Sequence, residues 1–371
     1  MTLRTDELDF ELDPARIARY PAEPRESARL MVVDLSAGEV HHRRVGDLGE
    51  YLGPGDCLVL NNTRVLAARF NCMRVDTGGK LEGLLMEQVA ARRWWTMLRK
   101  SRRLQPGHQL QLLEHDGTAS DEIFQVVELH DGRVLLELTG ERPVEGILGR
   151  LGEVPLPPYI RNARRDAGEP IEDLRDRDWY QTVYAREDGL ARSVAAPTAG
   201  LHLSRPMLAS LEQAGVRTAE LELEVGAGTF KPVEADTLEE HPMHSERCVV
   251  PAVTIETLRS LQIPRAEGRA RIIPVGTTAT RTLESLPIEL PATSAGPLAY
   301  ETDLLIEPGF DFRYLDGLLT NFHLPRSTLL ALVGAVCGMD RLKSLYQEAI
   351  DEGYRFFSYG DAMLLIASRN P

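Results

Sequence analysis

Cysteine is scarce in this chain, and long apolar runs are missing. Only four cysteines occur among 371 residues, and no two of them form a C-x-x-C pair. This usage excludes a disulfide framework and a zinc ribbon. The longest apolar stretch, Leu329–Gly338, is shorter than the ~18 residues that a membrane-spanning helix needs. The N-terminus turns acidic at once and has no apolar signal core, so we expect a cytoplasmic protein.

Positive charge is also in short supply. Lysine and arginine number 42 against 56 acidic residues, which leaves a formal net charge of -14. A protein that coats nucleic acid without sequence preference is normally basic, so that class is excluded. The hydrophobic fraction of 43% and the charged fraction of 26% are those of an ordinary globular protein, which excludes disorder of the whole chain.

One local exception to the acidic balance lies between Gln88 and Leu113, where no acidic residue occurs. Two tryptophans, Trp94 and Trp95, lie within this stretch. Two interpretations stay open, a solvated strand face with core tryptophans or a surface that contacts RNA phosphates. The candidate RNA-binding residues are Arg92, Arg93, Arg99, Lys100, Arg102 and Arg103.

The segment from Leu66 to Glu153 differs in pattern from the rest of the chain. Short apolar or alternating runs follow one another, separated by glycine-containing turns and without a convincing helix. This pattern predicts a small antiparallel β-barrel at residues 66–153. The runs expected to form its strands are Leu81–Leu85, Trp94–Leu98, Gln109–Leu113, Ile123–Glu128 and Val134–Leu138.

Strands and helices alternate after a charged connection. Arg161–Asp178 carries eleven charges in eighteen positions, which predicts an exposed loop. Beyond it, Val194–Ala196, Glu220–Val225 and Ala270–Val275 are strand-like, while Pro206–Ala214 and Ser327–Gly338 are helical. This alternation predicts an α/β sheet. We therefore expect a discontinuous α/β domain, residues 1–65 and 154–371, with the β-barrel as an inserted domain.

Three loops of small residues follow strand-like segments: Ser193–His202, Val225–Phe230 and Val275–Arg281. None is a P-loop or a G-x-G-x-x-G motif. Each alone is typical of a tight packing turn, but loops at helix N-termini favour anionic ligands, and three of them predict a ligand crevice. The candidate ligand-binding residues are Thr198, Gly200, Gly226, Gly228, Thr229, Gly276, Thr277, Thr278 and Arg281, of which Arg281 could bind a carboxylate.

Histidines and carboxylates supply candidates for acid–base chemistry. His241 and His244 lie close together, but Pro242 interrupts the helix that would align them as metal ligands. A metal-dependent hydrolase that uses this pair is the weakest alternative. Structural histidines and acid–base histidines are both compatible with the pattern, because imidazole titrates near neutral pH. The acid–base candidates are His202, His244, Glu246, His323 and Asp361.

Two late segments, Leu319–Thr328 and Tyr354–Met363, combine aromatic rings with amide, imidazole, hydroxyl and charged groups. Core packing explains such rings equally well, but the mixture also suits a site that holds a planar base beside a charged group.

Taken in order, these motifs resemble one family, the S-adenosylmethionine:tRNA ribosyltransferase-isomerases of queuosine biosynthesis. The resemblance covers essentially the whole chain. It rests on Asn61–Val65, Pro155–Ile160, Tyr180–Tyr184, Ala195–His202, Val225–Phe230, Met243–Glu246, Val275–Thr278, Thr320–Pro325 and Tyr354–Met363.

The resemblance implies a fold, a reaction and partners. The family fold is an α/β domain with an inserted β-barrel. The ribosyl part of S-adenosylmethionine, a substrate rather than a resident cofactor, is transferred to 7-aminomethyl-7-deazaguanine at the tRNA wobble position. It is isomerised there to give epoxyqueuosine, and adenine and methionine are released. The resemblance leads us to expect a cytoplasmic monomer that acts on tRNA, with no metal and no membrane.

The chain departs from the family pattern at several positions. Glu224 stands where family members usually have histidine, Leu203 where they have phenylalanine and Glu307 where they have tyrosine, and Leu190–Arg192 looks like an addition. If the missing histidine is catalytic, the alternative is a diverged, catalytically altered or inactive tRNA-binding relative. A carboxylate can still act as a base, so Glu224 does not by itself exclude turnover.

Overall fold

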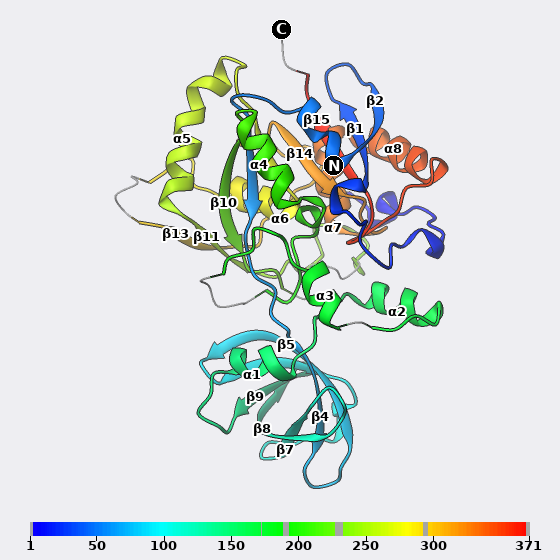
Figure 1. The fold of residues 1–371 in the computed structure, drawn as a ribbon, viewed down its shortest axis with the longest axis vertical. Coiled ribbons are helices and arrows are strands. Elements are labelled where there is room, and N and C mark those ends of the chain that lie inside the picture. The colour runs from blue at the N-terminus through cyan, green and yellow to red at the C-terminus, as the bar shows by residue number, and fades with distance from the viewer. Residues whose placement is uncertain (1–2, 172, 188–192, 227–232, 292–295, 369–371) are drawn as a thin grey trace.

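A computed structural model describes residues 3–171, 173–187, 193–226, 233–291 and 296–368 of the chain. Figure 1 shows two bodies, an α/β domain and a smaller barrel connected to it by the segments that enter β4 and leave α1 (Val144–Leu151). Within the described residues, no helix is both long enough and apolar enough to cross a bilayer. The expected α/β domain with a small antiparallel barrel is confirmed.

The α/β domain is built on a nine-stranded mixed sheet with the order β13-β11-β10-β3-β12-β14-β15-β1-β2. Its four central neighbours, β10, β3, β12 and β14, run parallel to one another, and β15 runs antiparallel to β14. The strands are β1 (Arg29–Asp34), β2 (Val40–Arg44), β3 (Cys57–Asn61), β10 (Arg217–Leu223), β11 (Glu246–Val250), β12 (Ile272–Val275), β13 (Leu298–Thr302), β14 (Gly317–Asn321) and β15 (Ala362–Ile366).

The central strands are buried on both faces, as expected where helices cover a largely parallel sheet. In β3, Cys57 and Val59 pack on one face, and Leu58 and Leu60 pack on the other. The first face is covered by α5 (Ala252–Ala266), α6 (Thr277–Glu284), α7 (Thr328–Cys337) and α8 (Met339–Asp351). The second is covered by α4 (Arg205–Gln213) and by the short 3-10 helices η4 (Val45–Glu50) and η6 (Thr198–His202).

The barrel closes in the order β4-β5-β6-β9-β8-β7. Its strands are β4 (Arg69–Arg74), β5 (Lys80–Ala90), β6 (Arg93–Leu98), β7 (Gln109–Leu113), β8 (Ala119–His130) and β9 (Arg133–Leu138). The expectation that this segment contains no helix is wrong. Helix α1 buries Val144, Ile147, Leu148 and Leu151 in the barrel core. This spacing is that of a helix with one apolar face, so the signal was present in the sequence.

The charged connection is not the exposed loop that its composition suggested. It forms α2 (Pro158–Asp166) and α3 (Asp173–Trp179), which lie between the barrel and the α/β domain (Figure 1). Arg164 and Asp176 form a bidentate salt bridge with N–O distances of 2.7 and 2.8 Å, and both side chains have 0% exposure. The Arg164 guanidinium also lies 4.3 Å from the ring centre of Tyr20. The high density of charged residues predicted exposure to solvent. That prediction fails because two of the eleven charged side chains, Arg164 and Asp176, pair with each other in the interior.

Replacement of Asp176 by alanine should lower the free energy of unfolding by ~3 kcal/mol, because it leaves the Arg164 charge buried without its partner. Asp166→Ala is the matched control, since its contact with Arg165 is exposed on both sides and such pairs contribute ~0–1 kcal/mol. Urea unfolding of both full-length variants measures the difference. Equal losses would contradict a structural role for the buried pair.

Candidate functional site

The loops singled out in the sequence meet at one edge of the sheet. Because β3, β10, β12 and β14 are parallel, their carboxyl ends share this edge, and the start of β15 joins them through the pairing of Asn321 with Ala362. A crevice at the carboxyl ends of parallel strands is the usual ligand site of such sheets. The strand expected at Val194–Ala196 is absent, and Ser193 makes only an isolated bridge with Val65.

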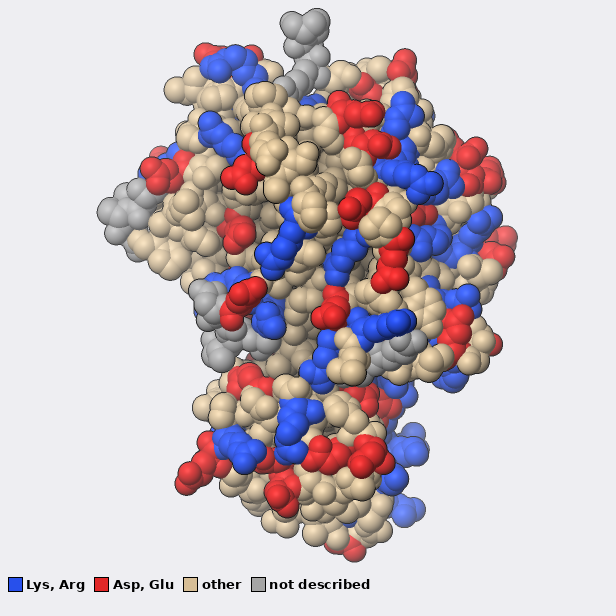
Figure 2. Space-filling model, viewed as in Figure 1, with Lys and Arg blue, Asp and Glu red and all other residues tan. Residues whose placement is uncertain are grey.

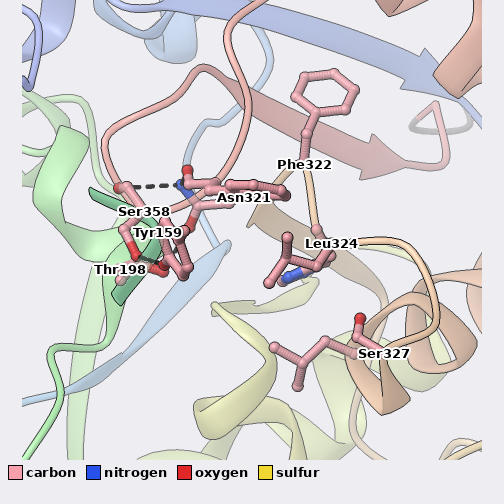
Figure 3. Close-up of a pocket in the computed structure, with 10 residues that line it drawn as sticks. Tyr159, Thr198, Asn321, Phe322, Leu324, Ser327 and Ser358 are labelled. Carbon is pink, nitrogen blue, oxygen red and sulfur yellow. Dashed lines mark hydrogen bonds between the residues drawn. The ribbon is translucent and has the colours of Figure 1, made fainter. Parts of the chain in front are cut away.

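Two adjoining pockets lie at this edge. The first, here called the aromatic pocket, has about 380 Å³ of space including the part open to solvent, and Figure 3 shows its lining. The second, the threonine pocket, has about 340 Å³. Thr198, Asn321, His323 and Leu329 line both. The aromatic pocket adds Tyr159, Phe322, Leu324, Ser327, Phe357 and Ser358, and the threonine pocket adds Ala196, Pro197, Ala199, Val225, Gly276, Thr277, Thr278 and Thr320.

Asn321, at the end of β14, is the hub of a buried hydrogen-bond network (Figure 3). Its Nδ2 lies 3.2 Å from the carbonyl oxygen of Phe357, which only accepts, so the amide nitrogen must face that side. Its Oδ1 therefore accepts from the Thr198 hydroxyl at 2.9 Å. Nδ2 also donates to Nε2 of His202 at 3.1 Å. The amide is thus held in one orientation at the boundary between the pockets.

His202 contacts Asn321 but lines neither pocket. Since its Nε2 accepts a hydrogen bond, the ring is neutral with its proton on Nδ1. Burial supports this state, because it lowers the pKa of His202 from 6.5 to about 4. His202 is one of the two histidines that the sequence favoured for proton transfer. Its position is instead that of a residue which orients Asn321.

His323 is the histidine that lines both pockets. Burial lowers its pKa to about 3, so the imidazole is neutral at pH 7. Its Nε2 lies 2.8 Å from the Thr320 hydroxyl, and its backbone N–H donates to the Tyr346 hydroxyl at 2.8 Å. A threonine hydroxyl can donate or accept, so both neutral tautomers of His323 keep this hydrogen bond. The ring can therefore change which nitrogen carries the proton without losing its anchor.

The other acid–base candidates are placed differently. Asp361 accepts backbone hydrogen bonds from Arg29 at 3.0 Å and Arg355 at 2.8 Å, and so fixes the turn before β15. Glu246 forms a buried salt bridge with Arg281 and accepts from the backbone N–H of Gly226 at 3.2 Å. His244 is exposed. None of these three carboxylate or imidazole groups lines a pocket.

Of the candidate ligand-binding residues in the three small-residue loops, some line a pocket and others do not. Thr198, Gly276, Thr277 and Thr278 line a pocket, and Thr278 is held by Nδ2 of Asn61 at 3.2 Å. Gly200 lies against Tyr184, whose hydroxyl a Cβ would overlap. Gly226 lines neither pocket, and Gly228 and Thr229 lie outside the described residues.

Arg281 also lies away from both pockets. Its charge is compensated by Glu246, and its Nε donates to the Leu304 carbonyl at 2.9 Å. The sequence suggested this arginine for a ligand carboxylate. Glu246 accepts from its Nη1, whereas its buried Nη2 has no hydrogen-bond partner among the described residues.

Most of the pocket-lining residues, among them Asn321, Tyr159, Phe357 and Ser358, were not named as individual candidates from the sequence. Phe357 has a φ of 73°, a left-handed conformation that is rare for a bulky residue. Its N–H donates to the Phe322 carbonyl at 3.0 Å, while its own carbonyl accepts from Asn321 and Gly360. Its ring lies 5.0 Å from that of Tyr159. The aromatic content of Tyr354–Met363 was the available signal, but only the backbone conformation shows which ring faces the cavity.

The basic run is divided by β6. Arg92 and Arg93 lie at one end, where they contact the Gly140 carbonyl and Glu137. Arg99–Arg103 lies at the other, ~20 Å away for a six-residue strand. Trp94 is in the barrel core, whereas Trp95 lies at the surface with the Arg133 guanidinium 5.2 Å from its ring.

The Arg99 end adjoins the α/β domain. Glu82 of β5 accepts from Arg99 at 3.4 Å, from Arg161 of α2 at 2.5 Å, and from Arg69. We call the exposed part of this region the junction surface, formed by Arg99, Lys100, Arg102, Arg103, Arg161 and Arg165. Figure 2 shows basic side chains where the barrel meets the α/β domain and along the barrel edge below α2. Three arginines around one carboxylate leave this junction positively charged.

Two further sequence questions concern metals and Glu224. No group of three or more histidine, cysteine or acidic side chains within the described part of the chain is arranged as metal ligands would be. Glu224 accepts a hydrogen bond from Arg247 at 2.5 Å and lines neither pocket. The residue that departs from the family pattern therefore lies outside the lining of both cavities.

Comparison with known proteins agrees with the resemblance in the motifs. A family model for queuosine biosynthesis protein matches residues 5–365. Proteins named S-adenosylmethionine:tRNA ribosyltransferase-isomerase are 43% identical in Desulfitobacterium hafniense, covering 98% of this chain and 100% of that protein, and 44% identical in Sphingopyxis alaskensis, covering 98% and 97%. A crystal structure of S-adenosylmethionine tRNA ribosyltransferase from Thermotoga maritima has a TM-score of 0.53 and 31% identity, over 97% of this chain and 100% of that one. The chain belongs to the queuosine biosynthesis protein family.

Proposed function

We propose that this chain is an S-adenosylmethionine:tRNA ribosyltransferase-isomerase. It transfers the ribosyl part of S-adenosylmethionine to 7-aminomethyl-7-deazaguanine in tRNA, isomerises it to epoxyqueuosine, and releases adenine and methionine. Family membership supports the reaction, and the pair of adjoining pockets at the carboxyl ends of the strands is the observation that carries it. A substrate with a planar base at one end and an amino acid at the other suits two cavities that share a wall.

The threonine pocket suits the methionine end. Gly276, Thr277 and Thr278 form the start of α6, where backbone N–H groups have no partner within the helix and favour a carboxylate. Gly276 has a φ of 92°, and a Cβ there would lie 3.3 Å from Ala199. The absence of a side chain lets a ligand approach this turn closely. The start of α6 would thus bind the methionine carboxylate, a role for which the sequence also suggested Arg281.

His323 is proposed as the group that accepts a proton from the substrate and donates one to the leaving adenine. The carbon next to the sulfonium must lose a proton, and adenine leaves more readily if it gains one. His323 is unprotonated at neutral pH, borders both pockets and keeps its anchor on Thr320 in either tautomer. His202 is proposed as a positioning residue, because its side chain hydrogen-bonds to Asn321 and lines neither pocket.

The junction surface is proposed to contact tRNA phosphates. Its residues come from the barrel and from α2, and Tyr159 at the start of α2 lines the aromatic pocket. RNA bound there would lie against the helix that reaches the site. Since the chain as a whole is acidic, a local basic surface must supply the attraction for a polyanion. We also propose that the enzyme acts as a monomer in the cytoplasm, in keeping with its four free cysteines.

The reaction has a direct test. Full-length protein incubated with S-adenosylmethionine and tRNA that carries 7-aminomethyl-7-deazaguanine should release adenine and methionine in equal amounts with the modified nucleoside. The control is the same tRNA with guanine at the wobble position, which lacks the aminomethyl nucleophile and should release none. Retention of tRNA without adenine release would contradict the proposal and favour an inactive tRNA-binding relative.

A further inference from the structure

We propose that the aromatic pocket is the subsite for the adenine of S-adenosylmethionine, and that the adjoining rings of Phe357 and Tyr159 form its aromatic wall. The inference rests on the proposed function and adds to it which cavity receives which end of the substrate. The wobble base of the tRNA is the competing occupant, and the experiment below separates the two.

The first argument is the chemistry of the two linings. Within the described residues, no Asp, Glu, Lys or Arg side chain lines either pocket. The threonine pocket includes the start of α6, whereas phenylalanine and tyrosine rings line only the aromatic pocket. A methionine end carries an ammonium and a carboxylate, and burial of unpaired charges is costly. Neutral adenine has no such cost and can pack on aromatic rings. The aromatic pocket also supplies the Tyr159 and Ser358 hydroxyls, 2.5 Å apart, and the Thr198 hydroxyl, and such groups can both donate and accept. Adenine has donor and acceptor atoms along its edges.

The second argument is the conformation of Phe357. A left-handed conformation in a bulky residue costs about 1–3 kcal/mol and persists only where the surrounding structure enforces it. Here the Phe322 carbonyl, Asn321 and Gly360 all bind the backbone of Phe357. Gly360 is required for this turn, because a Cβ would lie 2.5–2.7 Å from backbone atoms of Arg355 and Phe356. The fold thus holds one aromatic ring at the pocket wall, packed against the ring of Tyr159.

The third argument is position. The two pockets share Asn321 and His323, so a ligand that spans them passes the imidazole. With adenine in the aromatic pocket, the proton that His323 takes from the carbon beside the sulfonium is next to the leaving group. The bond from the ribosyl carbon to adenine breaks with its electron pair going to the base nitrogen. Transfer of that proton to adenine then restores neutral His323.

The test measures free adenine, free methionine and free 7-aminomethyl-7-deazaguanine binding to the full-length protein by titration calorimetry, without tRNA. Wild-type protein should bind adenine, and saturating methionine should leave the adenine Kd within about two-fold. Phe357→Leu should raise the adenine Kd at least ~10-fold and leave the methionine Kd unchanged. Phe310→Leu is the matched control, because its half-buried ring pairs with Phe312 outside the pocket lining.

Tyr159→Leu removes the second aromatic ring and its hydrogen bond to Ser358, but it leaves the backbone hydrogen bonds of the strained turn in place. It should therefore give the same result even if Phe357→Leu folds poorly. Three outcomes overturn the assignment: no adenine binding up to about 10 mM, an adenine Kd unchanged in both variants, or competition between adenine and methionine. Binding of the deazaguanine instead of adenine also overturns it and assigns the pocket to the tRNA base. Adenine binding with the expected pattern in a protein that shows no turnover would contradict the proposed reaction and still support the adenine subsite.

Discussion

Replacement of His323 by glutamine should lower turnover by ~10²–10⁴ and leave the Kd for S-adenosylmethionine within a few-fold. Glutamine keeps the approximate size of the side chain and can still hydrogen-bond to Thr320, but it has no imidazole nitrogen that can accept a proton during the reaction. The expected loss is therefore in kcat and not in binding. Release of adenine under single-turnover conditions, with enzyme in excess over precursor tRNA, measures the chemical step directly.

Variants of two other histidines serve as comparisons. His244→Gln changes an exposed side chain outside the pockets and should retain near-normal turnover. His202→Gln keeps an acceptor that Asn321 can use, so its loss should be much smaller than that of His202→Leu, which removes the acceptor. Near-normal turnover of His323→Gln would place the proton acceptor elsewhere. Equal losses in the two His202 variants would contradict a positioning role, because orientation of Asn321 depends on the acceptor.

Removal of the four barrel charges of the junction surface should weaken tRNA binding strongly and make it less dependent on salt. Each phosphate contact contributes about one unit to the slope of log K against log salt, so Arg99, Lys100, Arg102 and Arg103 changed together to alanine should flatten it by up to ~4 units. The adenine and methionine affinities should not change, because these residues line neither pocket. Filter binding of precursor tRNA across a series of salt concentrations measures the slope.

A charge-matched control separates a local contact from the effect of net charge. Arg43, Arg269, Arg341 and Lys343 lie on β2, after α5 and on α8, on the side of the α/β domain away from the barrel (Figure 1). Their change to alanine removes the same charge and should leave the slope nearly unchanged. A second comparison, Arg92 and Arg93 to alanine, tests the opposite end of β6. An equal slope for the barrel variant and wild type would remove the junction surface from the RNA interface.

Local pattern was sufficient for the fold class, an α/β domain with a small barrel, but not for every element. Alternating runs between glycine turns predicted the barrel, because a strand with one buried face must alternate apolar and polar residues. The three small-residue loops were found for the same reason, since backbone close to a ligand or a helix start restricts which residues fit. Where a local signal was overlooked, as for α1, its apolar spacing was still present in the sequence.

Only the tertiary structure shows which candidate residues line the pockets and which pair with each other elsewhere. Arg281 and Glu246 were suggested as separate functional groups, but they pair across 35 residues of sequence and neutralise each other in the interior. Arg164 and Asp176 looked like solvent-exposed charges and form a buried pair. Local sequence identifies the charged residues but does not show which distant residue each of them pairs with. A charged side chain is tolerated in the interior only when it has such a partner.

The three candidate histidines show most clearly what the sequence can determine and what depends on the packing. His202, His244 and His323 have the same side chain, and each lies in a polar motif of the sequence. The sequence by itself determined that imidazoles lie in loops at one end of the sheet, because turn residues and strand ends are local features. Only the packing decided that Asn321, 119 residues from His202, occupies its acceptor nitrogen, that His244 lies in solvent, and that His323 borders both pockets. The state of an imidazole depends on burial and hydrogen-bond partners, and both come from residues distant in the chain.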